Sequence, residues 1–180
     1  MENERDSILL RNIIQEHGEY LLRLAYFYVR DWPIAEDIIQ EVFVTYYLKS
    51  DQFENRSSLK TYLAKITVNK CHDHLRSWKN KIHIYTHRLF DNSSSKKETP
   101  EQILIDRDQD DLLIREVLDL SIKYRDVILL YYYQEFTIVE ISKILNCPEN
   151  TVKTRLSRAK AMLKSKLSGF EWEVILREQS

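Results

Sequence analysis

The feature that most restricts the fold of this sequence is its shortage of glycine and proline, with two Gly and three Pro in 180 residues. Tight turns between strands and phosphate-binding loops depend on glycine, which disfavours a many-stranded sheet and a glycine-rich nucleotide site. The prolines fall where helices begin or polar segments end, at Pro33, Pro100 and Pro148. The sequence therefore predicts an all-α fold.

One polar segment divides the chain. Residues 91–102, DNSSSKKETPEQ, have the composition of an interdomain linker. We therefore expect two small helical domains, residues 1–90 and 108–180, joined by a flexible linker at 91–107. The second domain should begin with one or two helices over 103–133, where apolar residues are frequent.

The N-terminal half predicts two helices between residues 20 and 50, divided at Asp31-Trp32-Pro33, and a long helix over 58–81. The second helix has an apolar face made of Ile34, Ile38, Val42 and Phe43. Its opposite face is mostly acidic and carries Glu36, Asp37, Gln40 and Glu41. One side of this helix is therefore expected in the core and the other in solvent.

Positive charge is confined to two blocks, although the formal net charge is only −1. Residues 54–90 contain eight Lys or Arg and two acids, and residues 151–169 contain six Lys or Arg and no acid. Two separate basic patches favour two docking surfaces for nucleic acid, with acidic surface left for another partner. Solvated helix faces would explain the same counts, so charge alone leaves both interpretations open.

Several classes of protein lack support. No apolar run approaches the roughly 20 residues of a membrane helix, and no signal peptide is visible, so we expect a cytoplasmic protein. Cys71 and Cys147 lie far apart in sequence, without a CxxC pattern, so no disulfide framework is expected. The run Cys71-His72-Asp73-His74 points in four directions on a helix, which argues against a metal site. Neither an enzyme nor a cofactor is expected, because no catalytic constellation is evident.

The second basic block has the pattern of a helix that reads duplex DNA. An apolar stripe consists of Val152, Leu156, Ala159, Leu163 and Leu167. The opposite face carries Asn150, Thr154, Ser157, Arg158 and Ala161, and the flanks carry Lys153, Arg155, Lys160 and Lys164. Small polar and Arg side chains suit base edges in the major groove, and flanking cations suit phosphates.

The preceding segment completes a helix-turn-helix. A short helix has an apolar stripe at Ile138, Ile141, Ile144 and Leu145. Asn146 suits a left-handed helix end, and Pro148 suits the start of the next helix. Two helices with a three-residue turn form the DNA-binding motif. A basic helix on the surface of an ordinary bundle is the alternative.

Three segments resemble the extracytoplasmic-function (ECF) sigma factors of bacterial RNA polymerase, in the sigma-70 family. EISKILNCPENTVKTRLSRAKAMLKSKL resembles region 4, and AEDIIQEVFVTYY (35–47) is similar to the polymerase-binding AED-x-x-Q-E-x-F segment. A third pattern, WL-x-x-I-x-x-N-x-x-x-D-x-x-R, is matched by Tyr62-Leu63, Ile66, Asn69, Asp73 and Arg76. The chain departs from the family with Tyr62 in place of Trp, Thr67-Val68 in place of Ala-Arg, and the tail FEWEVILREQS.

The resemblance implies a sigma factor that binds core RNA polymerase and directs promoter-specific initiation, with residues 1–90 as a region 2-like domain and 108–180 as a region 4-like domain. Polymerase-binding residues would be Glu36, Asp37, Gln40, Glu41 and Phe43. The melted minus-10 strand would be held by Asn55, Arg56, Ser57, Lys60, Tyr62, Lys65, Asn69, Arg76 and Lys79. The minus-35 duplex would be read by Glu140, Asn150, Thr151, Lys153, Thr154, Ser157, Arg158 and Lys160.

Some roles stay open within this hypothesis. Glu140 either accepts from a base or is an acid favoured by the helix dipole. Asn69 and Asp73 either contact DNA or orient Arg76, and for Asp73 we favour orientation. The family further implies an anti-sigma partner, often membrane-anchored, which would hold the chain at the membrane. The rival functions are a stand-alone helix-turn-helix regulator, which binds duplex without polymerase, and a nucleic-acid enzyme.

Overall fold

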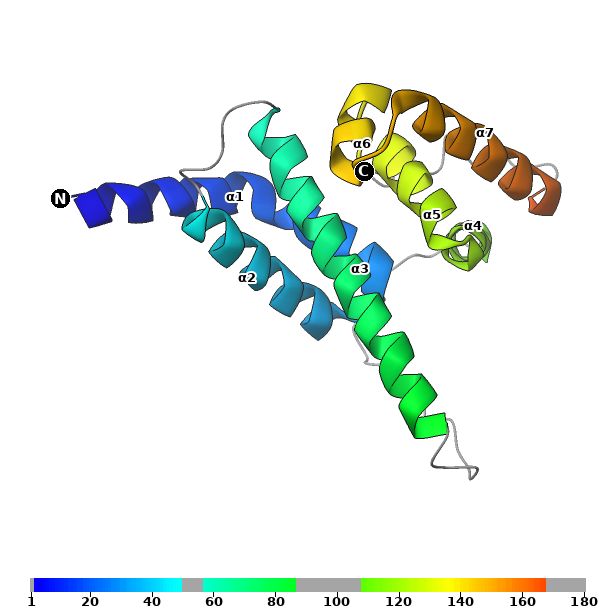
Figure 1. The fold of residues 1–180 in the computed structure, drawn as a ribbon, viewed down its shortest axis with the longest axis horizontal. Helices are drawn as coiled ribbons and strands as arrows, with labels where there is room; N and C mark the ends of the chain where they lie inside the picture. Colours follow the sequence, from blue (N-terminus) through cyan, green and yellow to red (C-terminus); the bar gives the residue numbers. More distant parts are fainter. Residues whose placement is uncertain (1, 50–56, 87–107, 168–180) are drawn as a thin grey trace.

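The computed structural model describes residues 2–49, 57–86 and 108–167, and it places side chains for 8–49, 57–77 and 112–167. Every regular element in these ranges is a helix, which confirms the predicted all-α fold (Figure 1). None of the described helices combines the length and apolar character needed to cross a membrane. The tail at 168–180 and the whole of the expected linker at 91–107 lie outside the described residues.

Three helices form an N-terminal unit: α1 (Glu2–Val29), α2 (Trp32–Leu48) and α3 (Leu59–Thr86). Each packs against the other two, and their shared core includes the fully buried Leu21, Leu24, Val42 and Leu63. The predicted helices are present, but α1 and α3 extend beyond the expected bounds. Side-chain burial in this core provides the hydrophobic stabilisation that short isolated helices lack.

The turn between α1 and α2 is built as the sequence predicts. The Asp31 carboxylate accepts a hydrogen bond from the Ile34 backbone N–H at 3.0 Å, and Pro33 occupies the first turn of α2. Arg30 has a left-handed backbone (φ 55°), and its N–H donates to the Tyr26 carbonyl. The Tyr26 ring stacks on Trp32 at 4.1 Å, which fixes the angle between the helices.

The C-terminal unit contains α4 (Asp108–Asp119), α5 (Ile122–Ile128), the π-helix η2 (Leu129–Tyr133), α6 (Ile138–Leu145) and α7 (Glu149–Lys166). The expected one or two helices over 103–133 are therefore two helices with a π-helical extension. In η2, Tyr132 and Tyr133 are buried, so these rings belong to the core.

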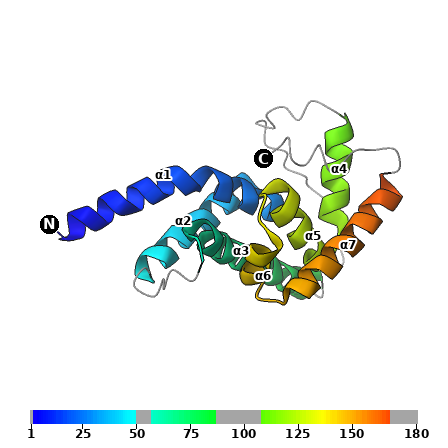
Figure 2. The same ribbon diagram turned by 90° about the horizontal axis from the view of Figure 1, so that it is seen from above.

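The two units pack against each other, with α3 beside α6 (Figures 1 and 2). Phe27 of α1 meets Tyr133 of η2 edge to face, with ring centroids 4.3 Å apart. The buried apolar side chains form one cluster that includes residues from both units. The sequence made no prediction of this contact.

Cys71 and Cys147 should differ strongly in thiol reactivity. Burial, reinforced by the charge of Asp126, raises the pKa of the fully buried Cys71 to about 12, whereas Cys147 is only partly buried. Because the thiolate is the nucleophile, the reactive fraction of Cys71 falls by about three orders of magnitude. We expect a maleimide at pH 7.5 to label Cys147 first and Cys71 only after unfolding. Fast labelling of folded Cys147→Ser protein would contradict this burial.

Candidate nucleic-acid interface

The helix-turn-helix is formed as predicted. Thr137 and Glu140 make a reciprocal capping box at the start of α6, in which Thr137 Oγ1 accepts from the Glu140 N–H and Glu140 Oε2 accepts from the Thr137 N–H. Asn146 ends α6 in the left-handed conformation (φ 49°, ψ 49°), and Pro148 precedes the first residue of α7. Local capping thus sets the turn that orients α7.

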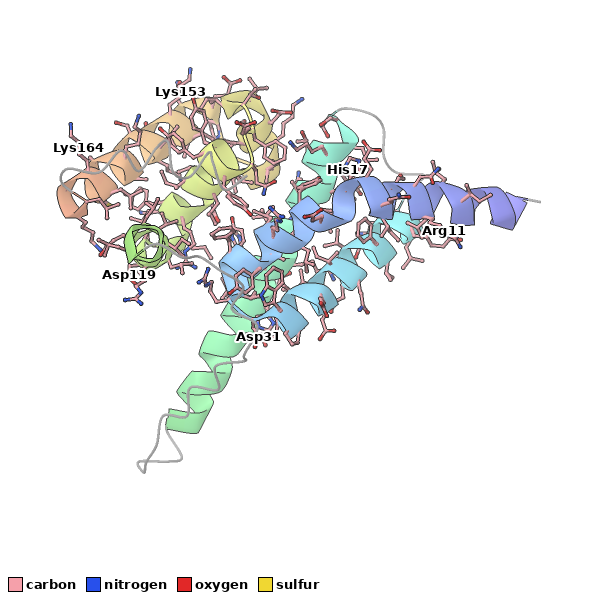
Figure 3. The ribbon with its side chains drawn as sticks, turned by 180° about the vertical axis from the view of Figure 1, so that it is seen from behind. Arg11, His17, Asp31, Asp119, Lys153 and Lys164 are labelled. Atoms are coloured by element: carbon pink, nitrogen blue, oxygen red, sulfur yellow. The ribbon has the colours of Figure 1, made fainter. Side chains whose placement is uncertain are left out.

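The two faces of α7 are separated as the spacing indicates. The predicted apolar stripe is buried: Val152, Leu156, Ala159, Leu163 and Leu167. Of the predicted minus-35 set on α7, Asn150, Lys153, Thr154, Ser157 and Arg158 are exposed, and Thr151 and Lys160 are partly buried. Figure 3 shows Lys153 and Lys164 directed away from the rest of the molecule. The polar face of α7 is therefore exposed.

A hollow of about 350 Å³ lies between α5 and α7. It is lined by Lys123, Tyr124, Asn150, Thr151, Thr154, Arg155 and Arg158. Lys123 and Tyr124 were missed at the sequence level, because nothing in sequence places the start of α5 beside α7. The Lys123 ammonium lies 5.0 Å from the centre of the Tyr124 ring. Three cationic side chains, Lys123, Arg155 and Arg158, therefore line this hollow.

The Glu140 side chain accepts hydrogen bonds from other residues of the protein. Besides the capping box, its Oε1 accepts from Thr61 Oγ1 of α3 at 3.3 Å. Burial opposes ionisation, but hydrogen bonds from Thr137 and Thr61 and the charge of Lys60 outweigh it and lower the pKa of Glu140. The structure favours the helix-start role for this acid, and it adds a contact to α3 that the sequence did not suggest.

The predicted minus-10 residues differ in their accessibility along α3. Lys60, Asn69 and Arg76 are exposed, and Ser57, Tyr62 and Lys65 are partly buried. Asn55 and Arg56 lie outside the described residues, and for Lys79 only the helical backbone is described. The Asp73 carboxylate accepts from Arg76 at 2.8 Å, which is the orienting role favoured for Asp73.

The predicted acidic face of α2 is exposed. Glu36, Asp37, Gln40 and Glu41 all reach solvent, but Glu41 pairs with Lys70 of α3 at 2.7 Å. Phe43 is different, because only 6% of it is exposed and its ring belongs to the core. Its place in the predicted polymerase-binding set stays a prediction.

An apolar groove of about 650 Å³ runs between α1 and α2 beside these acids. Phe43 lines it together with Glu36, Gln40 and mostly apolar side chains of both helices. Val44 and Leu48 are 57% and 73% exposed on the same helix. The sequence pattern missed this groove, because its α1 wall is distant in sequence from the acidic helix.

The run from Cys71 to His74 does not gather ligands. Cys71 is buried, Asp73 pairs with Arg76, and His72 contacts Asp126 at 3.0 Å. In the described part of the chain, no group of three His, Cys, Asp or Glu side chains is placed to hold a metal ion.

Two family models match the chain. Sigma-70 region 2 matches residues 13–81, and Sigma-70, region 4 matches residues 110–163. SigV, an RNA polymerase sigma factor of Bacillus subtilis, is 30% identical over 89% of this chain and 92% of its own. The ECF sigma factor SigW of the same species is 28% identical, with 90% of each chain covered. The sigma-E factor of Escherichia coli is 26% identical over 73% of this chain and 72% of its own.

Two solved structures share the fold. The sigma factor RpoE of Bartonella quintana, in complex with the anti-sigma factor NepR, has a TM-score of 0.66 and 22% identity, covering 94% of this chain and 99% of its own. CnrH, in complex with the cytosolic domain of CnrY, has a TM-score of 0.63 and 19% identity, covering 88% and 86%. The region matches and the identity to SigV show that this chain belongs to the ECF sigma factors of the sigma-70 family, which bind RNA polymerase and direct transcription initiation.

Proposed function

We propose that the two units divide promoter recognition between them. Residues 1–90 bind core polymerase and hold the melted minus-10 strand, residues 108–180 read the minus-35 element as duplex, and residues 91–107 join them. The observation that carries this proposal is the segregation of α7 into a buried apolar stripe and an exposed polar face, beside a hollow lined by cations. The chain itself performs no chemistry, which the core enzyme supplies.

The duplex-reading face centres on Thr154, Ser157 and Arg158. All three are exposed, and the short Thr154 and Ser157 let the helix approach the bases closely. The Arg158 fork then contacts a base edge, while Lys153 and Arg155 neutralise phosphates. We assign Glu140 to positioning α6 through its capping box.

The strand-holding surface lies on α3. Lys60, Asn69 and Arg76 are exposed and supply positive charge and hydrogen-bond donors. Tyr62 packs against Tyr46 with ring centroids 6.4 Å apart, which holds an aromatic face near the start of the helix. Unstacked bases need such surfaces, and the backbone of the strand needs cations.

Polymerase docks on the acidic face of α2. Glu36, Asp37 and Gln40 are exposed there, and the adjoining apolar groove supplies the hydrophobic area that acids alone lack. An anti-sigma factor is a further partner, because the similar RpoE structure is a complex with one. We place this activity in the cytoplasm, with an anti-sigma factor able to hold the chain at the membrane.

The direct test is transcription with purified components. Core RNA polymerase and this chain should initiate at discrete genomic sites that share two upstream elements, whereas core enzyme alone should not. Sequencing the 5′ ends of the transcripts would locate the start sites, and comparison of the DNA upstream of these sites would identify both elements. Binding to duplex without specific initiation would instead favour a stand-alone regulator.

Lys123→Ala should weaken binding to a minus-35 duplex by a similar factor for all sequences. The side chain lines the hollow from α5, outside the predicted base-reading helix α7, so we expect its ammonium to meet phosphate rather than a base. The slope of log affinity against log salt should decrease by about one. Lys49→Ala, which removes an exposed charge from the other unit, should change neither quantity. A loss confined to one DNA sequence would mean that Lys123 reads a base.

A further inference from the structure

An exposed tryptophan stands at the start of α2, next to the acidic face on which polymerase is proposed to dock. Trp32 is the first residue of α2 and is 40% exposed. Glu36 and Gln40 follow one and two turns later, so the three side chains lie along the same side of the helix. The acids alone leave the exposed part of this indole ring without a role.

Contacts within the N-terminal unit hold the ring in one position. It stacks on Tyr26 with ring centroids 4.1 Å apart and an angle of 12° between the two planes. The Arg30 guanidinium lies 4.9 Å from the centre of the same Tyr26 ring. The Asp31 carboxylate caps the first turn of α2, on which Trp32 stands. Because the indole is already ordered, little conformational entropy is lost when a partner covers it.

The charges near Trp32 favour a protein partner over a nucleic acid. Within five residues of it in sequence, three exposed carboxylates, Asp31, Glu36 and Asp37, outnumber the single cation Arg30. Figure 3 labels Asp31 at the turn between α1 and α2. A DNA strand stacked on the ring would bring its phosphates close to these carboxylates, which would repel them. A basic protein surface instead meets the opposite charge, as docking on the acidic face of α2 requires.

We propose that Trp32 is an anchor for core polymerase, which covers the exposed part of the indole when it docks on α2. This inference rests on the proposed docking of polymerase on that helix. The exposed 40% of the residue corresponds to about 100 Å², and its burial strengthens binding by about tenfold to a hundredfold. The docking face then begins at the α1–α2 turn, where Tyr26 and Arg30 are positioning residues for its first contact.

The first test measures the affinity of full-length variants for core polymerase. Trp32→Ala should weaken binding by about tenfold to a hundredfold. Trp32→Phe keeps a ring that can stack on Tyr26, so its affinity should stay within about threefold of the wild type. Leu112→Ala is the matched control, because it truncates a side chain that is 44% exposed on α4, and it should bind as the wild type does. Circular dichroism should show the same helicity in all three variants.

Hydroxyl-radical footprinting of the wild type gives a second readout that requires no substitution. Oxidation of Trp32, measured by mass spectrometry, should slow severalfold when core polymerase is added, because a covered ring no longer meets solvent. If Trp32→Ala loses helicity, this footprint decides the matter. Unchanged oxidation in the complex, or wild-type affinity of a folded Trp32→Ala variant, would overturn the proposal. Wild-type affinity with impaired promoter opening would also overturn it and would assign the ring to DNA.

Glu36→Lys distinguishes failure of this inference from failure of the proposed function. Glu36 is exposed one turn after Trp32, and reversing its charge should weaken polymerase binding whether or not the indole contributes. Loss of affinity in Glu36→Lys but not in Trp32→Ala would contradict the role of Trp32 alone. Wild-type affinity in both variants, without protection of Trp32, would contradict the docking of polymerase on α2 itself.

Discussion

Leu163→Ala should lower the free energy of unfolding by about 2–5 kcal/mol, the largest effect we expect from a single truncation in the C-terminal unit. Leu163 is fully buried on the inner face of α7, where the helix packs against α4, α5 and α6. The substitution removes buried apolar area and leaves a cavity that neighbouring helices fill only partly. Since a domain of this kind is stable by about 5–15 kcal/mol, much of the unit's stability would be lost.

Urea denaturation followed by circular dichroism measures this loss. Met162→Ala is the control, because it truncates a side chain of similar size one residue earlier that is 41% exposed. Its effect should stay within about 0.5 kcal/mol. The Leu163 variant should also bind minus-35 duplex less well near its unfolding midpoint, with an unchanged preference between DNA sequences. If the two substitutions lowered the free energy of unfolding equally, α7 would have to turn a different face toward the core.

The face of α7 was predictable because local spacing determines it. Val152, Leu156 and Ala159 recur at helical intervals, and the structure buries all three. The left-handed Asn146 was predictable for a similar reason, since few residue types tolerate that conformation at a helix end. In each case the deciding interactions lie within a few residues of one another.

Contacts between distant segments were not predictable in this way. Thr61 and Glu140 are 79 positions apart, and the sequence around either residue does not indicate that the two side chains are in contact. Lys123 joins the hollow beside α7 only because α5 packs there. Phe43 shows a related limit: the family pattern places it in a polymerase-binding segment, but burial in the core determines what its ring contacts.

The π-helix η2 depends on tertiary packing as well. The Gln134 N–H donates to the Leu129 carbonyl five residues earlier at 2.9 Å, a pattern that no residue in LLYYY specifies. Its effect is to direct adjacent rings to different neighbours. Tyr133 meets Phe27 of the N-terminal unit, whereas Tyr132 lies beside Lys160 of α7.

Arg158→Ala should cost about 1–3 kcal/mol of minus-35 recognition, a loss of roughly tenfold to a hundredfold in affinity for the preferred duplex. Arg158 is exposed near the middle of α7 and lines the hollow that Lys123 borders, so we expect its guanidinium to reach a base edge. A bidentate contact of this kind discriminates between bases. The variant should therefore lose its preference for one position of the element, and binding to non-specific DNA should change much less.

Lys153→Ala provides the comparison on the same helix. Its ammonium is exposed and directed outward from the flank of α7, where a phosphate contact is expected (Figure 3). The Lys153→Ala substitution should weaken binding to all duplexes alike and should reduce the slope of log affinity against log salt by about one. Competition binding against duplexes substituted at each position of the element, at two salt concentrations, separates the two patterns.

Affinity for core polymerase should match the wild type in both variants, because α2 is unaltered. An Arg158 variant that lost affinity for polymerase to the same extent as affinity for DNA would show that this side chain supports the fold instead of reading the promoter.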